Sequence, residues 1–315
     1  MGIAGTDPSG EALAGRRLPI RIADLPPKAC LVRLEHAGRR TTALWSDGRL
    51  ELVRLGLDGL LRLSLADMRG ELEHTTGGLD PAQCELLAPA ESQEVWAAGV
   101  TYLRSRAARM EESIEGDVYA RVYAAERPEM FFKAAGWRVV GHGGTAGVRP
   151  DSSWNVPEPE LAVLSNSQGE PVAYACGNDM SSRSIEGENP LYLPQAKVYD
   201  RSCSIGPAAV LAWEAEPSGA RITMRITRGG LLVFDGAASL SEMVRDPAEL
   251  SAVLHSAYPL PDGAWLMTGT SLVPPLPYTA EAEDVVTIEI EGIGRLVNTI
   301  AVVPHSGAHA RPRLT

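Results

Sequence analysis

Two glutamates, Glu158 and Glu160, stand two residues apart directly before the apolar run LAVL. In an extended strand, residues two apart project from the same face, so their carboxylates are expected to lie side by side. Asp179 follows the next apolar run and is expected to join them from the end of the neighbouring strand. Buried carboxylates are costly unless a cation compensates them, and an all-oxygen set favours Mg²⁺, with Mn²⁺ or Ca²⁺ as substitutes, over zinc. The alternative is an exposed strand start, where Pro159 is tolerated because it donates no ladder hydrogen bond.

Lys197 lies further along the chain, in the segment PQAKVY. A lysine that is buried beside a cation loses its proton more readily than an exposed one, so Lys197 is a candidate base or electrostatic partner. The alternative is an ordinary solvated lysine. The four cysteines are scattered without a CxxC pair, which indicates small buried thiols rather than a disulfide framework.

The elements that position these residues belong to an ordinary globular chain. Its 315 residues are 44% hydrophobic and 22% charged, which is enough for one large or two moderate domains. The net charge of -11 argues against a nucleic-acid partner, and the 5% of aromatic residues argues against a stacking platform for single strands. No apolar run reaches the length of a membrane-spanning helix and no secretory segment is visible, so we expect a cytoplasmic protein with no membrane partner.

A domain boundary is expected near residue 90, after the linker-like segment HTTGGLDPAQCELLAPA. Residues 18–65 are typical of short strands, with Ser46-Asp47-Gly48 as a hairpin turn, whereas residues 60–72 are ambiguous. We therefore predict a small β-rich N-terminal accessory domain over residues 1–90 and a catalytic domain over residues 91–315.

The larger part combines strands with a few helices. A helix is expected over residues 102–125 and another over 246–255, where Asp246 caps the first turn and Pro247 takes the first position. The glycine-rich run 141–147 leads into VRPDSSWNVPEPE, which has no helical pattern, so a tight turn is expected rather than a phosphate loop. Strands are expected at residues 95–100, from 130, at 284–291, and in a hairpin that turns at Gly229-Gly230 after residues 221–228.

Several blocks in order carry a family resemblance over residues 95–303: AAGVTY, FFKA, VPEPELAVL, YACGNDMSSR, AKVYDRSCSIGP, LMTGTS and EDVVTIEIEGIGRLVNTI. With them, the chain resembles the catalytic domain of the fumarylacetoacetate hydrolase superfamily. The resemblance implies a mainly β fold with some helix (α+β), built as a mixed β-roll, and an assembly as a homodimer or homotetramer. It also implies a divalent cation, usually Mg²⁺, and a 2-oxo acid substrate. The cation would be held at Glu158, Glu160 and Asp179, in a pocket lined by Lys197, Arg183 and Thr270.

The chain departs from this family's carbon–carbon bond hydrolases at the water-activating pair. Ser105 stands where those enzymes carry a histidine, and Ala108 stands where they carry a glutamate. Neither residue acts as a general base at neutral pH, which argues against hydrolysis. An acylpyruvase-like hydrolase and a 2-oxo-acid decarboxylase on the same site remain the alternative enzymes. A non-catalytic cation-binding β module is the alternative outside enzymes.

A narrower resemblance rests on SRSIEGENPLYLPQAKVYDRSCSIGP, VTYLRSR and AERPEMFFKA, which look like blocks of the family's 2-keto-3-deoxy-pentonate dehydratases. These enzymes convert 2-dehydro-3-deoxy-D-arabinonate, or its enantiomer, to 2,5-dioxopentanoate. The resemblance implies that Lys197 removes a C3 proton next to a ketone polarised by the cation. The expected acid for the departing C4 hydroxyl is Glu129, with Glu186 as the second candidate, and the alternative for each is an exposed carboxylate without a role in the reaction. Further substrate contacts are expected from Glu186, Tyr102, Ser105, Glu188 and Asn189, although a solvated loop is the alternative for the last two.

Overall fold

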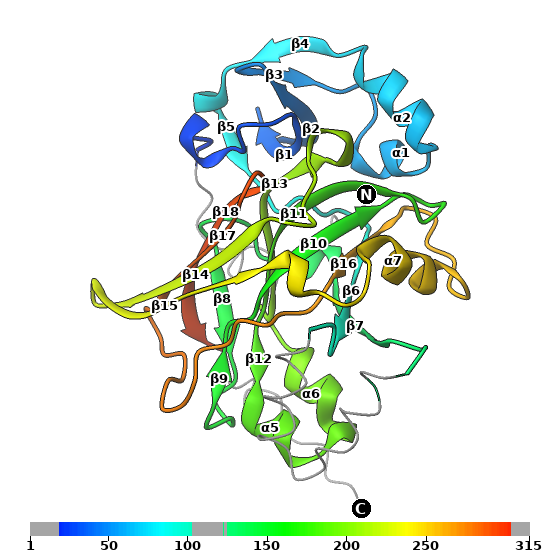
Figure 1. The fold of residues 1–315 in the computed structure, drawn as a ribbon. Coiled ribbons are helices and arrows are strands. Elements are labelled where there is room, and N and C mark those ends of the chain that lie inside the picture. The colour runs from blue at the N-terminus through cyan, green and yellow to red at the C-terminus, as the bar shows by residue number, and fades with distance from the viewer. Residues whose placement is uncertain (1–18, 103–121, 123–124, 304–315) are drawn as a thin grey trace, which may run out of the picture.

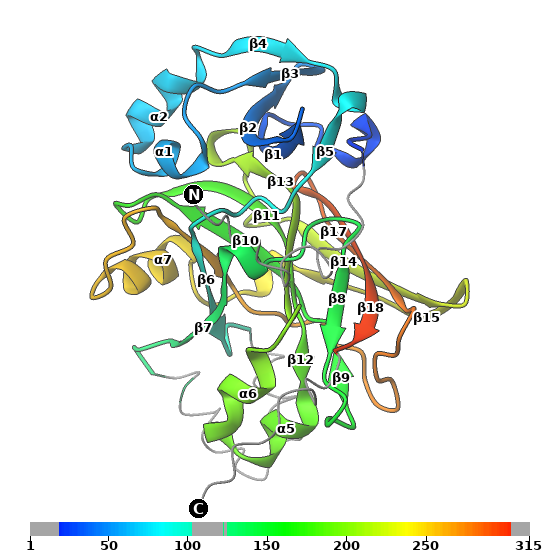
Figure 2. The same ribbon diagram turned by 180° about the vertical axis from the view of Figure 1, so that it is seen from behind.

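The computed structural model describes residues 19–102, 122 and 125–303 of the chain. Strands dominate these residues and form two large sheets, with short helices at the two ends of the molecule and one at its side (Figures 1 and 2). None of the helices in these ranges is both long enough and apolar enough to span a membrane.

The larger sheet has eleven strands and carries the candidate site. Its order is β4-β3-β2-β1-β13-β11-β10-β16-β6-β7, with β5 paired to β1 beside this path. Neighbouring strands are antiparallel except β16 and β6, which run parallel. The strands are β1 (Cys30–His36), β2 (Arg39–Ser46), β3 (Arg49–Leu52), β4 (Thr76–Leu79), β5 (Cys84–Leu86), β6 (Glu94–Gly99), β7 (Glu129–Ala135), β10 (Pro159–Ser165), β11 (Pro171–Asp179), β13 (Cys203–Leu211) and β16 (Ala264–Met267).

The second sheet has five strands in the order β15-β14-β17-β18-β8, of which only β18 and β8 are parallel. A two-stranded ribbon, β12-β9, lies apart from both sheets. The strands are β8 (Thr145–Val148), β9 (Asn155–Val156), β12 (Ser181–Ser182), β14 (Arg221–Arg228), β15 (Leu231–Ser239), β17 (Val285–Ile290) and β18 (Gly294–Val302). The prediction of a mainly β fold with mixed sheets is confirmed.

The helices are short. They are α1 (Leu57–Leu61), α2 (Leu65–Leu72), α5 (Arg183–Glu188), α6 (Leu193–Lys197) and α7 (Pro247–His255). Single 3-10 turns occur at η1 (Ile22–Asp24), η2 (Pro81–Gln83), η3 (Gly136–Arg138), η4 (Pro190–Tyr192), η5 (Ala212–Glu214) and η6 (Leu240–Glu242).

The N-terminal strands and helices α1 and α2 gather at one end of the molecule, and α5 and α6 lie at the opposite end (Figure 1). Strand β1 pairs with β13, so the N-terminal strands extend the same sheet that carries the site. The boundary near residue 90 stays a prediction. The expectation of strands throughout residues 18–65 is wrong at Leu57–Leu61, which is helical. Leu57, Leu60 and Leu61 are all buried, and their i, i+3, i+4 spacing suits one face of a helix.

Local turn and cap signals in the sequence are borne out. The β2–β3 hairpin turns at Asp47 and Gly48, which both have positive φ, and β14 turns into β15 at Gly229-Gly230. Asp246 caps α7 by accepting a hydrogen bond from the Ala248 N–H at 2.7 Å. The glycine-rich run turns tightly and leads into strand β8, which agrees with the expected turn. The helix expected over residues 102–125 lies almost entirely outside the described residues.

Two apolar cores fill the two faces of the larger sheet. One core joins this sheet to the second sheet, and the other packs it against α1 and α2. Strand β10 contributes to both, since Leu161 and Val163 lie in the first core and Ala162 and Leu164 in the second. Because side chains alternate along a strand, Glu160 lies on the same face as Ala162 and Leu164, and it is buried there.

Candidate metal centre and active site

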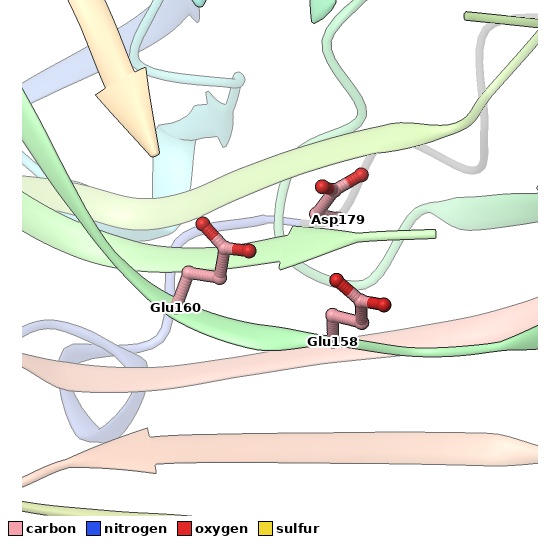
Figure 3. A group of neighbouring side chains, drawn as sticks. All are labelled: Glu158, Glu160 and Asp179. Carbon is pink, nitrogen blue, oxygen red and sulfur yellow. The ribbon is translucent and has the colours of Figure 1, made fainter. Parts of the chain in front are cut away.

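Antiparallel pairing of β10 with β11 brings the three predicted carboxylates together. Glu160 is paired with Gly177, and the Asp179 N–H donates to the Glu158 carbonyl at 2.9 Å. Glu158, Glu160 and Asp179 are each at most 2% exposed, and one oxygen of each lies within 4.8 Å of the others. Figure 3 shows Glu158 and Glu160 extending from the same strand segment, with Asp179 beside them. We name these three residues the carboxylate triad.

Glu160 is the most strongly perturbed member of the triad. Burial raises its pKa well above the ordinary value, and the negative charges of Asp179 and Glu158 raise it further. Lys197 and a hydrogen bond from the Gly269 N–H, at 2.7 Å from Oε2, act in the opposite direction. Gly269 has φ of +89°, and a Cβ there would collide with Thr101, so glycine is required at this position. The LMTGTS block thus serves the site through a backbone N–H.

Lys197 is buried in the site rather than solvated. It is the last residue of α6, and its Nζ lies 2.8 Å from Glu158 Oε2, 2.9 Å from Asp179 Oδ2 and 2.5 Å from Ser181 Oγ. The Phe131 ring lies 5.9 Å from the same Nζ. Neither Ser181 nor Phe131 was among the site residues predicted from the sequence.

Arg183 provides a second cation on the triad. It is the first residue of α5, and its Nη2 lies 2.8 Å from Glu158 Oε1. The two oxygens of Glu158 therefore face Arg183 on one side and Lys197 on the other. Arg183 Nε also lies 3.8 Å from Glu186 Oε2. Glu186, the second candidate for the acid, is therefore linked to Glu158 of the triad through Arg183.

A third cation, Lys133 of β7, was not among the site residues predicted from the sequence. It is fully buried, and its Nζ lies 2.5 Å from Asp179 Oδ1. The chain has only three lysines, Lys28, Lys133 and Lys197, among 29 lysine and arginine residues. Two of these three lysines meet at Asp179. The scarcity of lysine was therefore the signal that the composition contained.

Glu129, the first residue of β7, lies beside a cavity of about 330 Å³ whose lining includes Arg127, Pro190 and Leu193. Within this strand Glu129 alternates onto the same face as Phe131, which packs near Lys197. The Glu129 carboxylate lies directly against Gly99 on β6, where an added Cβ would collide with it. Glycine at position 99 therefore leaves the space that the Glu129 carboxylate occupies.

The remaining predicted residues are less directly joined to the triad. Tyr102 is buried, and burial followed by the charge of Glu160 raises the pKa of its hydroxyl. Thr270 is 9% exposed and its Oγ1 accepts from the Leu272 N–H at 3.1 Å. Glu188 is exposed, and Asn189 caps η4 by accepting from the Leu191 N–H.

Substrate contacts of these four residues stay a prediction. Ser105 and Ala108 lie outside the described residues, so the departure from the hydrolase pattern also stays a prediction from the sequence.

The triad has the composition of a hard-cation site. All of its ligand atoms are carboxylate oxygens, which suit Mg²⁺, Mn²⁺ or Ca²⁺. A divalent cation would offset the mutual repulsion that raises the pKa of Glu160. Lys133, Lys197 and Arg183 offset the charges of the three carboxylates, so a bound divalent cation would leave the site locally positive despite the net charge of -11.

Comparison with known proteins fits this geometry. Residues 94–301 match the family model of the fumarylacetoacetate (FAA) hydrolase C-terminal region. The chain belongs to the fumarylacetoacetate hydrolase family. The resemblance predicted from the sequence blocks over residues 95–303 is therefore confirmed.

Curated relatives in this family are dehydratases of sugar acids. A probable 2-keto-3-deoxyxylonate dehydratase of Haloferax volcanii is 48% identical over 247 residues, covering 78% of this chain and 85% of the relative. A 2-dehydro-3-deoxy-D-arabinonate dehydratase of Saccharolobus solfataricus is 41% identical over 217 residues, covering 67% of this chain and 73% of that protein.

Solved structures agree in fold. A 2-keto-3-deoxy-D-arabinonate dehydratase complexed with magnesium and 2,5-dioxopentanoate superposes with a TM-score of 0.77 at 32% identity, covering 87% of this chain and 99% of that one. A fumarylacetoacetate hydrolase of Exiguobacterium antarcticum, at 21% identity and a TM-score of 0.67 over 87% of this chain and 100% of the other, shares the fold alone.

Proposed function

We propose that this protein is a magnesium-dependent dehydratase that converts a 2-keto-3-deoxy-pentonate to 2,5-dioxopentanoate. The observation that carries the proposal is the buried carboxylate triad with Lys197 hydrogen-bonded to two of its members. The names of the two curated dehydratases, and the magnesium and 2,5-dioxopentanoate in the solved dehydratase, support the same substrate and cation.

Glu158, Glu160 and Asp179 are the proposed cation ligands. When bound, Mg²⁺ supplies polarisation of the C2 carbonyl, which acidifies the protons on C3. The protein excludes bulk water from the carboxylate triad, because all three of its side chains are almost fully buried. Arg183, paired with Glu158, is proposed to attract the substrate carboxylate.

Lys197 is the proposed base at C3, and Glu129 the proposed acid at the C4 hydroxyl, with Glu186 as the second candidate for the acid. The C3–H and C4–O bonds break and a C3=C4 double bond forms, so one water leaves and no oxidant is required. Two proton shifts, from C5 to C3 and from the C5 hydroxyl to C4, then give the aldehyde of 2,5-dioxopentanoate. The cavity that Glu129 lines is the proposed place for the C4–C5 end of the substrate.

Tyr102, Ser105, Thr270, Glu188 and Asn189 complete the proposed substrate contacts. The family resemblance also supports a homodimer or homotetramer as part of the proposal, and the cytoplasmic location expected from the sequence is proposed with it. Size-exclusion chromatography with light scattering measures the first of these directly, and a monomer at micromolar concentration would contradict it.

A product assay tests the proposed reaction. The protein is incubated with both enantiomers of 2-keto-3-deoxy-pentonate and with acylpyruvates, in Mg²⁺ and in EDTA. We expect 2,5-dioxopentanoate from a pentonate in Mg²⁺, none in EDTA, and acylpyruvate cleavage slower by on the order of 10²-fold or more, the contribution of a missing general base. Comparable cleavage of acylpyruvates, or release of carbon dioxide from the pentonate, would instead favour the hydrolase or the decarboxylase.

Gly99→Ala tests the role of Glu129 without altering its carboxylate. The new methyl group would displace Glu129, so dehydration is expected to fall on the order of 10²-fold, the lower end of what a general acid contributes. Cation affinity should not change, because the nearest atoms to a Cβ at position 99 belong to Glu129. Gly78→Ala on β4 is the matched control, since a Cβ there meets nothing within 4 Å. Full turnover by Gly99→Ala would remove Glu129 as the acid.

A further inference from the structure

Lys133 makes more contacts at the site than charge balance with Asp179 requires. Its Nζ lies 2.5 Å from Asp179 Oδ1, donates to the Met180 carbonyl at 3.1 Å, and donates to the Lys197 carbonyl at 2.5 Å. Lys133 thus donates two hydrogen bonds to backbone carbonyls and faces Asp179 as the cation of an ion pair. The Lys133 side chain is 0% exposed, so its ammonium group is surrounded by the protein itself.

The three acceptors belong to two separate parts of the fold. Asp179 ends β11 and Met180 follows it, whereas Lys197 ends α6 and Lys133 itself belongs to β7. One ammonium group thus fixes a triad carboxylate and the backbone of the proposed base relative to each other. The views in Figures 1 and 2 agree with this, since α6 lies beyond the end of β7, and the two elements are in contact.

Helix α6 needs such an anchor. It has five residues, and a helix of that length is not stable without tertiary contacts. The Lys197 carbonyl receives hydrogen bonds from Lys133 Nζ and from Ser202 Oγ, at 2.5 and 2.9 Å. Because the side chain of Lys197 starts from the same residue, movement of this carbonyl moves the point from which Nζ reaches C3.

We propose that Lys133 is a positioning residue, which sets the orientation of Lys197 by holding the Lys197 carbonyl and Asp179 in one three-way contact. This inference rests on the proposed function, in which Lys197 is the base. The competing explanation is that Lys133 acts only on Asp179, as a counter-charge for a cation ligand. The two explanations differ in whether the effect of Lys133 depends on the Lys197 side chain.

A double-mutant cycle with Lys133→Met and Lys197→Met tests the proposal. Lys133→Met is expected to lower kcat for dehydration by about 10²-fold, the cost of misplacing a reacting group by about 1 Å, while KM changes by no more than about threefold. Adding Lys133→Met to Lys197→Met should give almost no further loss, since the side chain that Lys133 positions is already absent. Lys28→Met, at a half-buried lysine beside the Gly292 turn, is the matched control and should keep wild-type kinetics.

Each outcome decides the matter. Multiplicative losses in the double variant, or a Lys133→Met loss that is explained entirely by weaker Mn²⁺ binding in calorimetry, would overturn the positioning role. Lys133→Arg is the second variant if Lys133→Met does not fold. It keeps the charge but cannot serve three acceptors from one nitrogen, so the proposal expects the same dependence on Lys197, and wild-type turnover would refute it. Failure of the proposed function is separate, because wild-type protein would then not dehydrate the pentonates at all.

Discussion

Glu160→Gln is expected to abolish cation binding and turnover together. The substitution keeps the volume of the side chain and removes one anionic ligand from a three-carboxylate set. Loss of a group that merely supports a metal ligand costs about 10- to 100-fold, so loss of a ligand itself should lower Mn²⁺ affinity and kcat by more than about 100-fold. Calorimetry with Mn²⁺ and the pentonate assay measure the two effects independently.

The fold of Glu160→Gln should persist, and its stability separates a ligand from a structural residue. A glutamine amide oxygen can still accept from the Gly269 N–H that now donates to Glu160 Oε2. Burial and two neighbouring carboxylates oppose the charge of Glu160, as its raised pKa indicates, so removing the charge relieves repulsion when no cation is bound. We expect an unchanged or higher melting temperature in EDTA and no further rise on adding Mg²⁺.

Glu289→Gln is the matched control for this variant, because Glu289 is exposed on β17. It should keep wild-type cation binding, melting behaviour and turnover. A Glu160→Gln protein that remains active in EDTA would contradict both the triad as a cation site and the mechanism built on it.

The triad could be predicted because the information that forms it is local. Glu158 and Glu160 share a face through strand alternation alone, and Asp179 reaches them across a pairing of consecutive strands. The turn residues and the cap of α7 were equally local. Each of these features depends on a few neighbouring residues whose chemistry permits one geometry.

Lys133 could not be predicted in this way, because its strand is not a neighbour of the strands that carry the triad. Strand β7 is at the edge beyond β6, and two of the three Lys133 acceptors are backbone carbonyls. A backbone carbonyl carries no side-chain signature, so no motif marks such a contact. The available signals were its place in the FFKA block and the scarcity of lysine in a chain rich in arginine, since a lysine offers three donors from a single atom.

Gly99 and Gly269 illustrate the same limit. A glycine in a strand end or a loop is an ordinary turn signal, and its significance here depends on the atoms opposite it. Those atoms belong to Glu129 for Gly99 and to Thr101 for Gly269, which are brought there by β-sheet pairing and by the path of the loop after β16. The positions are therefore understood only once the sheet is assembled.

Lys197→Met is expected to stop proton exchange at C3 of a bound 2-oxo acid. A general base contributes on the order of 10²–10⁴-fold, so deuterium incorporation at C3, followed by NMR in heavy water with Mg²⁺ present, should slow by that factor. Lys28→Met serves again as the control with an unchanged rate. Deuterium entering C3 at the wild-type rate would mean that another group removes the proton.

The stability of Lys197→Met gives an independent test of the same contacts. Lys197 Nζ lies 2.8 Å from Glu158 and 2.9 Å from Asp179, and removing one partner from a buried ion pair costs about 3–5 kcal/mol. Without a cation, Lys197→Met should therefore unfold at a clearly lower temperature than the wild type. A divalent cation would supply the missing positive charge, so Mg²⁺ should raise the melting temperature of Lys197→Met by more than it raises that of the wild type. Equal shifts in the two proteins would show that Lys197 does not balance the charge of the triad.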